Sequence, residues 1–244
     1  MENFDSPKIL LREANSHIEK IDIIISEFFT DCEAISFVDI EPDTGNKLFK
    51  FRFSKTKVPD RVNYLANTVI NDLRHSLDQA ACTAFSILTG NTPPKTLYFP
   101  ITDNLADLNG RLRKDFPESL HEAFRVIAPY RTGNDIICLL AKTAQEKHVS
   151  ICDISGFIGG SSGKTGMATG IINMVIPPVW DFTNNEVLVA KTTPDGVFEA
   201  EFAYSPEITF KNTRHIDGQP IIPFLRAAFE ATSMAINVIE AAVI

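Results

Sequence analysis

Apolar residues recur every three or four positions in four long stretches of the chain, the spacing that places one apolar stripe along a helix. These stretches cover residues 7–29, 59–89, 134–144 and 220–243. The second stretch is the longest, starts after a proline and stops at Gly90, as a helix with a glycine stop does. We predict that this helix is the core of the fold and that the other three pack against it. Two shorter helices are expected near 103–114 and 118–127.

In the remaining stretches apolar and polar residues alternate, which is typical of strands with one face in solvent. Phe49, Phe51 and Phe53 alternate with polar residues after a Pro-Asp-x-Gly turn, which predicts a β-hairpin at 34–57 whose phenylalanines face the core. Beyond residue 149 the pattern changes from helical to extended. It predicts strands at 149–158, 171–176, 187–191 and 198–210, a flexible glycine-rich connection at 156–170 and a turn at 193–196.

These elements predict an α+β fold: a helical bundle built on a long central helix, with a β-hairpin and an antiparallel β-sheet in the C-terminal half before a final helix. Residues 1–150 are expected to form the helical region and to include the hairpin at 34–57. Residues 151–219 are expected to form the antiparallel sheet region. The C-terminal helix at 220–244 is expected to pack back on the bundle, which makes the chain one compact domain.

Composition narrows the function classes. The 244 residues include 23 Lys and Arg against 31 Asp and Glu, a net charge of −8, which excludes a generally basic nucleic-acid coat. With 44% hydrophobic and 22% charged residues, the chain is too apolar for disorder and too interrupted for a membrane span. The N-terminal residues lack the basic start and apolar core of a signal peptide. We therefore expect a cytoplasmic protein that does not enter a membrane.

The motifs of metal, cofactor and nucleophile chemistry are weak in this chain. Its four cysteines form no C-x-x-C pair, which predicts free thiols, and its five histidines have no H-x-x-x-H spacing. No G-x-S-x-G nucleophile motif occurs. The segment 159–165 is one residue shorter than a phosphate-binding loop, and a β-branched run follows where that loop needs a helix. We expect neither a metal nor a cofactor.

One polar constellation lies in the middle of the predicted central helix. Arg74 and Asp78 are four residues apart, so they share a helix face, and they lie close to the apolar stripe. Charges so near a core need partners, and Lys147 and His148 at the end of the fourth predicted helix are candidates. The group, with His75, is either a polar clamp between helices, a catalytic or ligand-binding set, or a number of unrelated solvated charges. These five residues are the candidate catalytic residues.

A local basic strip surrounds the predicted hairpin. Its cations occupy one stretch of an otherwise acidic chain, beginning at Lys47. The candidate nucleic-acid-binding residues in it are Lys50, Arg52, Lys55, Lys57 and Arg61. Because period two forces Lys50 and Arg52 onto the face opposite the phenylalanines, we expect both to point outward. The alternative is an exposed edge strand that its lysines keep soluble.

Four short motifs follow one another along the first 150 residues. They are L-R-x-x-L-D at 73–78, Tyr-Phe-Pro-Ile at 98–101, Ala-Pro-Tyr at 128–130 and Lys-His at 147–148. In this combination and order the chain resembles a widespread family of uncharacterised bacterial proteins, in which LRxxLDH, FPI, QPY and DKH are expected at comparable positions. The resemblance covers residues 1–150 and is looser afterwards.

The helical part of that family is in turn similar to the HEPN group of helical proteins, many of which are toxin or defence ribonucleases. This resemblance implies an arginine and a histidine with four to six residues between them on a helix at a dimer interface. There they support metal-free attack of a ribose 2′-hydroxyl on its own phosphate. Counting from Arg74, the expected histidine falls on Gln79, which cannot exchange a proton near neutral pH. Only Arg12 and His17 have the spacing, and chance makes such a match common.

Three functions remain as alternatives. The first is a cytoplasmic HEPN-like binding or regulatory protein of a bacterial defence or mobile-element system, a homo-oligomer and most simply a dimer, whose partner is RNA, DNA or another protein. The second is a metal-independent ribonuclease that uses Arg74 with His75 or His148, or Arg12 with His17. The third is a structural oligomer with no small ligand. The sequence leaves open whether the protein is an enzyme.

Overall fold

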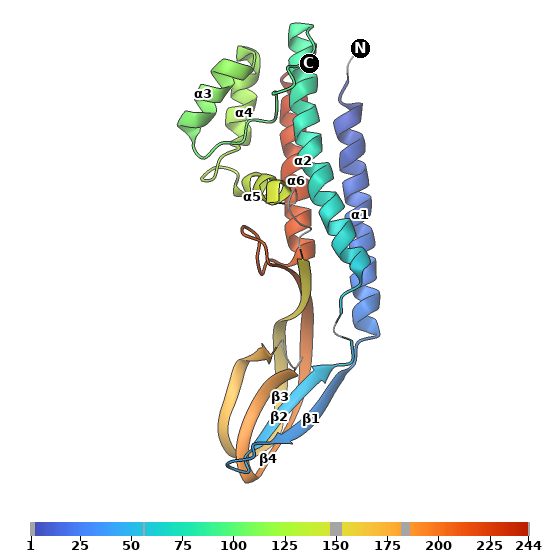
Figure 1. The fold of residues 1–244 in the computed structure, drawn as a ribbon, viewed down its shortest axis with the longest axis vertical. Coiled ribbons are helices and arrows are strands. Elements are labelled where there is room, and N and C mark those ends of the chain that lie inside the picture. Colours follow the sequence, from blue (N-terminus) through green and yellow to red (C-terminus); the bar gives the residue numbers. More distant parts are fainter. Residues whose placement is uncertain (1–2, 56, 147–152, 182–185, 244) are drawn as a thin grey trace. The chain divides into compact units, whose positions relative to one another are not determined.

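A computed structural model describes residues 3–55, 57–146, 153–181 and 186–243 (Figure 1). Side chains at 153–165, 175–181 and 200–206 fall outside that description. Contacts between residues divide the chain into two compact units. The helical unit consists of Met1–Ile23, Asp60–Asp153 and Phe210–Ile244, and the sheet unit of Ile24–Pro59 and Ile154–Thr209.

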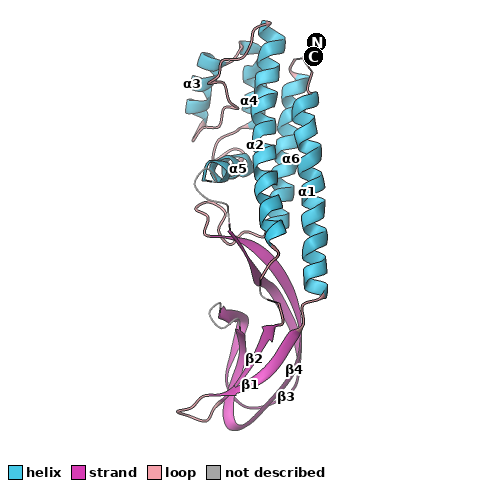
Figure 2. Ribbon diagram, turned by 45° about the vertical axis from the view of Figure 1, so that its right-hand side comes forward, coloured by secondary structure: helices cyan, strands magenta, loops and turns pink. Residues whose placement is uncertain are grey.

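Three long helices are α1 (Asp5–Thr30), α2 (Asp60–Thr89) and α6 (Ile221–Ala241). They lie side by side in the helical unit, to which α1 contributes its residues up to Ile23 (Figures 1 and 2). The apolar stripe of α2 is fully buried, including Leu73 and Leu77. Helix α2 packs against α6 and α5 (Asp135–Glu146), and its Gln79 accepts a hydrogen bond from Ser6 of α1. The prediction that the second helix is central and contacts the first helix, the helix predicted at 134–144 and the last helix is confirmed.

Helix α6 is apolar on more than the face that packs in the bundle. By length and composition alone it could cross a membrane. Its most buried side chains include Phe224, Leu225, Ala228 and Ile236, which lie in the core of the helical unit. Packing against α2 therefore accounts for much of its apolar character.

The shorter helices follow where the sequence predicts them. Helix α3 (Leu105–Asp115) starts at Asn104, whose side chain accepts a hydrogen bond from the backbone N–H of Asp107. A single turn of 3₁₀ helix at Glu118–Leu120 leads into α4 (His121–Ile127). Asn134 caps α5 by accepting from the backbone N–H of Ile137. These helices place the segment 97–101 beside α2.

In the part of the chain that the structure describes, the sheet unit contains four strands in the order β1-β2-β4-β3. Their bounds are β1 Ala34–Ile40, β2 Lys47–Phe53, β3 Asp153–Asp181 and β4 Glu186–Lys211. The hairpin strands pair antiparallel, and β2 also pairs antiparallel with β4, with Phe51 opposite Val187. The core of the unit comprises Phe51, Phe53, Val187, Val189, Ala190 and Phe198, with Phe49 packed at its margin. The predicted α+β fold is confirmed.

Two details predicted for the C-terminal half are wrong. The glycine-rich segment 156–170 is not a connecting loop, because it lies within the continuous strand β3. Glycines adopt extended backbone readily, so their number did not indicate a loop. The turn predicted at 193–196 also lies within one strand, β4. The strand is nevertheless bent at this point. The evidence is the close approach of Gly196 to Thr192, since a Cβ placed on Gly196 would lie 2.6 Å from the Cβ of Thr192.

Candidate functional site

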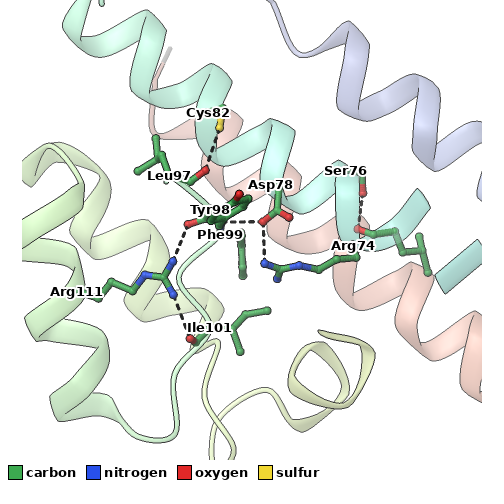
Figure 3. Close-up of polar contacts among 10 residues, drawn as sticks. Arg74, Ser76, Asp78, Cys82, Leu97, Tyr98, Phe99, Ile101 and Arg111 are labelled. Carbon is green, nitrogen blue, oxygen red and sulfur yellow. Dashed lines mark hydrogen bonds and ion pairs between the residues drawn. The ribbon is translucent and has the colours of Figure 1, made fainter. Parts of the chain in front are cut away.

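The polar constellation of α2 is centred on the carboxylate of Asp78. Its Oδ1 lies 2.9 Å from the guanidinium of Arg74 and accepts a hydrogen bond from the backbone N–H of Phe99, also at 2.9 Å (Figure 3). The helix period brings Arg74 and Asp78 onto one face, as the sequence predicts. The second partner is a backbone group of the segment 97–101. The carboxylate therefore connects one turn of α2 to a segment about twenty residues later in the chain.

The same segment is held from its other side by α3. Arg111 donates hydrogen bonds to the backbone carbonyls of Tyr98 and Ile101, at 3.4 Å each (Figure 3). The ring of Phe99 is fully buried and packs edge-on against Phe124, with 5.6 Å between ring centroids. Two arginines, one carboxylate and one buried ring thus fix the backbone of 97–101 between α2 and the short helices.

Burial controls the electrostatics of this cluster. It raises the pKa of the Asp78 carboxyl above its ordinary value, a rise that the Arg74 charge and the Phe99 N–H partly oppose. Burial likewise lowers the pKa of Arg74, against the attraction of Asp78. Each charge is therefore stabilised chiefly by its partner, so removing one of them leaves the other poorly solvated.

Of the remaining candidate catalytic residues, only His75 lies in the described part of the chain. His75 is exposed on the surface of α2. Lys147 and His148 lie outside the described residues, so the predicted contact of Asp78 with either one stays a prediction. The Phe99 N–H that bonds to Asp78, and the Arg111 side chain that holds the same segment through the Tyr98 and Ile101 carbonyls, were missed by sequence reasoning. A backbone donor has no residue signature, and the only signal was the Tyr-Phe-Pro-Ile motif itself.

The one arginine and histidine pair with HEPN-like spacing lies on α1. Arg12 is exposed, whereas His17 is half-buried and its Nδ1 lies 3.8 Å from Oδ2 of Asp72 on α2. This distance is too long for a hydrogen bond. Gln79, at the position where the signature expects a histidine, uses its Oε1 to accept from the Ser6 hydroxyl at 2.7 Å. These groups link α1 to α2.

Two of the described cysteines are held as protonated thiols by burial. In the described residues Cys32, Cys82 and Cys138 are free, and no group of His, Cys, Asp and Glu is arranged to hold a metal ion. Burial raises the pKa of Cys82 and raises that of Cys138 to about 11, so both are protonated thiols at neutral pH.

The predicted basic strip is largely matched by internal acceptors. The Lys50 ammonium lies 3.1 Å from both Asp39 and Glu186, and its side chain is only 18% exposed. Burial lowers the pKa of Lys50, but the hydrogen bonds to these carboxylates outweigh it and leave the pKa raised. Lys50 does lie on the face opposite Phe51, as predicted, but it is not a free cation at the surface.

The other cations of the strip are dispersed. Arg52 is exposed and lies 5.6 Å above the ring of Phe37, and Lys55 pairs with Asp31 at 3.0 Å. Lys47 donates to the backbone carbonyl of Gly196. Arg61 lies over the ring of Tyr64 and belongs to the helical unit, whereas Lys57 belongs to the sheet unit.

The chain was compared with protein-family models, with curated proteins and with solved structures, and none of the three comparisons found a match.

Proposed function

We propose that this chain is a binding protein that recognises another protein through its sheet unit, and that the Arg74 and Asp78 cluster is a structural clamp. The observation that carries the proposal is a run of nine exposed residues in β3, 166–174. Four of them are large apolar side chains, 37% to 50% exposed: Met167, Ile171, Ile172 and Met174. Large apolar side chains that are exposed close together on one strand are a feature of protein-binding surfaces.

The geometry of the α2 cluster supports a structural role. A general acid or base must exchange a proton with a substrate, so it needs an accessible position and a suitable pKa. Asp78 instead accepts hydrogen bonds from Arg74 and the Phe99 N–H, and it holds two parts of the fold together. Gln79 stands where the ribonuclease signature expects a histidine, and its side-chain oxygen accepts a hydrogen bond from the Ser6 hydroxyl.

Charge supports a protein partner over a nucleic acid. The chain carries a net charge of −8, and Lys50, whose side chain is only 18% exposed, is paired with two carboxylates. A phosphate backbone is bound by cations that release counterions, and cations already matched by carboxylates contribute little to that term. Residues 1–150 resemble an uncharacterised bacterial family whose helical part is similar to the HEPN group, and this adds a regulatory role in bacterial defence or a mobile element. That part of the proposal depends on the resemblance alone.

Capture of the partner with a matched pair of variants tests the proposal. Full-length protein is immobilised and exposed to nuclease-treated extract of the cells that express it, and the bound proteins are quantified by mass spectrometry. Ile172→Glu with Met174→Glu places charges in the apolar run, whereas Asn173→Glu adds a charge at the polar position between them. We expect one protein to be enriched by the parent and by Asn173→Glu, and reduced at least tenfold with the double variant.

Two outcomes contradict the proposal. The first is that the parent and the double variant capture the same proteins in the same amounts. The second is cleavage of RNA in the presence of a chelator that is lost in Arg74→Lys, since that result assigns the α2 cluster to the ribonuclease alternative.

A further inference from the structure

Strand β1 forms one edge of the described sheet, because its only neighbour in the strand order is β2 (Figure 1). Six of its seven residues are exposed, on both faces of the strand. The exposed residues include Ile35, Val38 and Ile40, at 41%, 50% and 62%. Soluble proteins protect such edges with prolines, inward-pointing charges or lysines on the strand, and β1 contains no proline and no lysine. An edge of this composition is a template for pairing with another strand.

The pairing with β2 shows which backbone groups of β1 face that open edge. At one end of the β1–β2 pairing the Glu41 N–H donates to the carbonyl of Asn46, and at the other end the Ser54 N–H donates to the carbonyl of Glu33. Both pairs fit the register of the strands between them. Hydrogen-bonded pairs alternate along an antiparallel ladder, so the odd-numbered residues of β1 bond to β2. The N–H and C=O groups pointing away belong to Ala34, Ser36, Val38 and Ile40. The Ile40 N–H donates instead to the side chain of Asp39, as an outward-facing group does.

We propose that a second copy of this chain covers the edge, through antiparallel pairing of β1 with β1 about Phe37. In this register Ala34 lies opposite the partner's Ile40, and Ser36 opposite the partner's Val38. All four outward-facing residues of each strand are then hydrogen-bonded over the full length of β1, and the Ile40 N–H exchanges its bond to Asp39 for one to the partner's Ala34. A shift by two residues in either direction leaves part of the edge uncovered, so this is the two-fold register that satisfies every group.

The side chains of β1 fit the same register. Phe37 meets the partner's Phe37 at the two-fold axis, in a pair without backbone hydrogen bonds, where side chains come closest. Ile35 lies opposite the partner's Asp39. Arg52 of β2 pairs with Ile35 of β1. Its guanidinium lies over the ring of Phe37, which belongs to the edge strand β1. The partner's Asp39, which is 54% exposed, is thereby placed within reach of Arg52, and symmetry makes this contact twice.

A cysteine cross-link tests the register. In the proposed dimer the two Cα atoms of residue 37 are about 4.5 Å apart, within the span of a disulfide. The two copies of residue 35 are separated by four residues along the strand, more than about 10 Å. We expect Phe37→Cys to form a disulfide-linked dimer under mild oxidation and Ile35→Cys to form none above the parent. The native cysteines are common to both variants. Equal cross-linking of both, or of neither, would overturn the register and with it the proposal.

Sedimentation of the full chain over a range of concentrations tests the edge itself. The pairing of two seven-residue strands buries less area than a standard interface of about 1,600 Å². We therefore expect weak association, with a dissociation constant of about 1–100 µM. Val38→Pro removes one outward N–H without touching the ladder to β2, and Val38→Lys adds an edge lysine. We expect both to raise the dissociation constant at least tenfold with an unchanged melting temperature. The β3 variant Ile172→Glu with Met174→Glu keeps the dimer.

A parent that stays monomeric at 200 µM would overturn the proposal. So would a dimer that Val38→Lys leaves intact, because that dimer uses another surface. The proposed function is tested separately, since loss of the β3-dependent partner with an intact dimer contradicts the binding proposal alone.

Discussion

At the scale of single residues, the chain uses its buried charges for structure. Asp78 is stabilised by Arg74 and by the Phe99 N–H, and Lys50 by Asp39 and Glu186. In each case a group partly removed from water is matched by opposite charge, which is the condition under which such groups are tolerated. The consequence is that replacing one member destabilises the fold more than the weak attraction of an exposed pair suggests.

Replacing Asp78 measures the clamp. We expect Asp78→Ala to lower the free energy of unfolding by about 2–3 kcal/mol, between the values for exposed and fully buried ion pairs, because Arg74 and the Phe99 N–H lose their acceptor. Asp103→Ala, at an exposed position, is the control and should change it by less than about 0.5 kcal/mol. Urea denaturation gives both values. A loss below about 0.5 kcal/mol for Asp78→Ala would show that the cluster is not a clamp.

Replacing Lys50 distinguishes an internal ion pair from a surface cation. Lys50→Glu places a third carboxylate beside Asp39 and Glu186, so we expect unfolding to become easier by about 2 kcal/mol, with Lys50→Met costing about 1. Thermal and urea denaturation of both variants provide the comparison. Equal stability of Lys50→Glu and the parent would restore the view that Lys50 faces solvent and is free to bind phosphate.

At the scale of elements, the hydrophobic pattern predicts the helices well because one apolar stripe determines both their length and their buried face. The stripe of α2 and the hairpin phenylalanines are confirmed in detail, with Leu73, Leu77 and Phe51 almost completely buried. The strands after residue 150 were predicted less well. Gly196 and its neighbours have the composition of a turn, yet the pairing continues through them, since strand pairing depends on partners far away in sequence.

The buried face of α2 is tested by one charged substitution. Leu77→Asp introduces an unpaired carboxylate at a position with no exposure, and we expect no soluble folded protein. Asn71→Asp adds the same side chain to the exposed face of the same helix and should express normally. Circular dichroism of the soluble fraction reports the outcome. A folded Leu77→Asp protein would contradict the assignment of the core.

The contact between the β1–β2 loop and β4 makes stability depend on pH. Hydrogen bonds from Lys191, then from Thr44 and Asn46, lower the pKa of Glu41 from 4.5 to about 2. A carboxyl whose pKa is lower in the folded state stabilises it above the unfolded pKa and loses that contribution as pH falls. We therefore expect Glu41→Gln to flatten the fall in melting temperature between pH 4.5 and 2. A parallel fall in both proteins would contradict the contact.

At the scale of the whole molecule, the sequence predicts the fold class but not what joins its parts. The pairing of β2 with β4 brings residues about 140 positions apart into register, and no local pattern specifies that choice. The clamp likewise depends on a contact between distant residues. The sequence predicts that Arg74 and Asp78 share a helix face, but it does not predict the hydrogen bond from the Phe99 N–H. Which residues are exposed depends on how the strands pair. The exposed edge β1 and the apolar run of β3 were therefore not predicted either.

We propose that the whole molecule acts by binding through its sheet unit, whereas the α2 cluster only supports the fold. The most direct measurement is the amount of partner captured by two variants side by side, each assayed below its melting temperature. We expect Ile172→Glu with Met174→Glu to lose at least tenfold, and Arg74→Lys to retain the partner within about twofold. Loss of the partner in Arg74→Lys, with full capture by the β3 variant, would contradict the account.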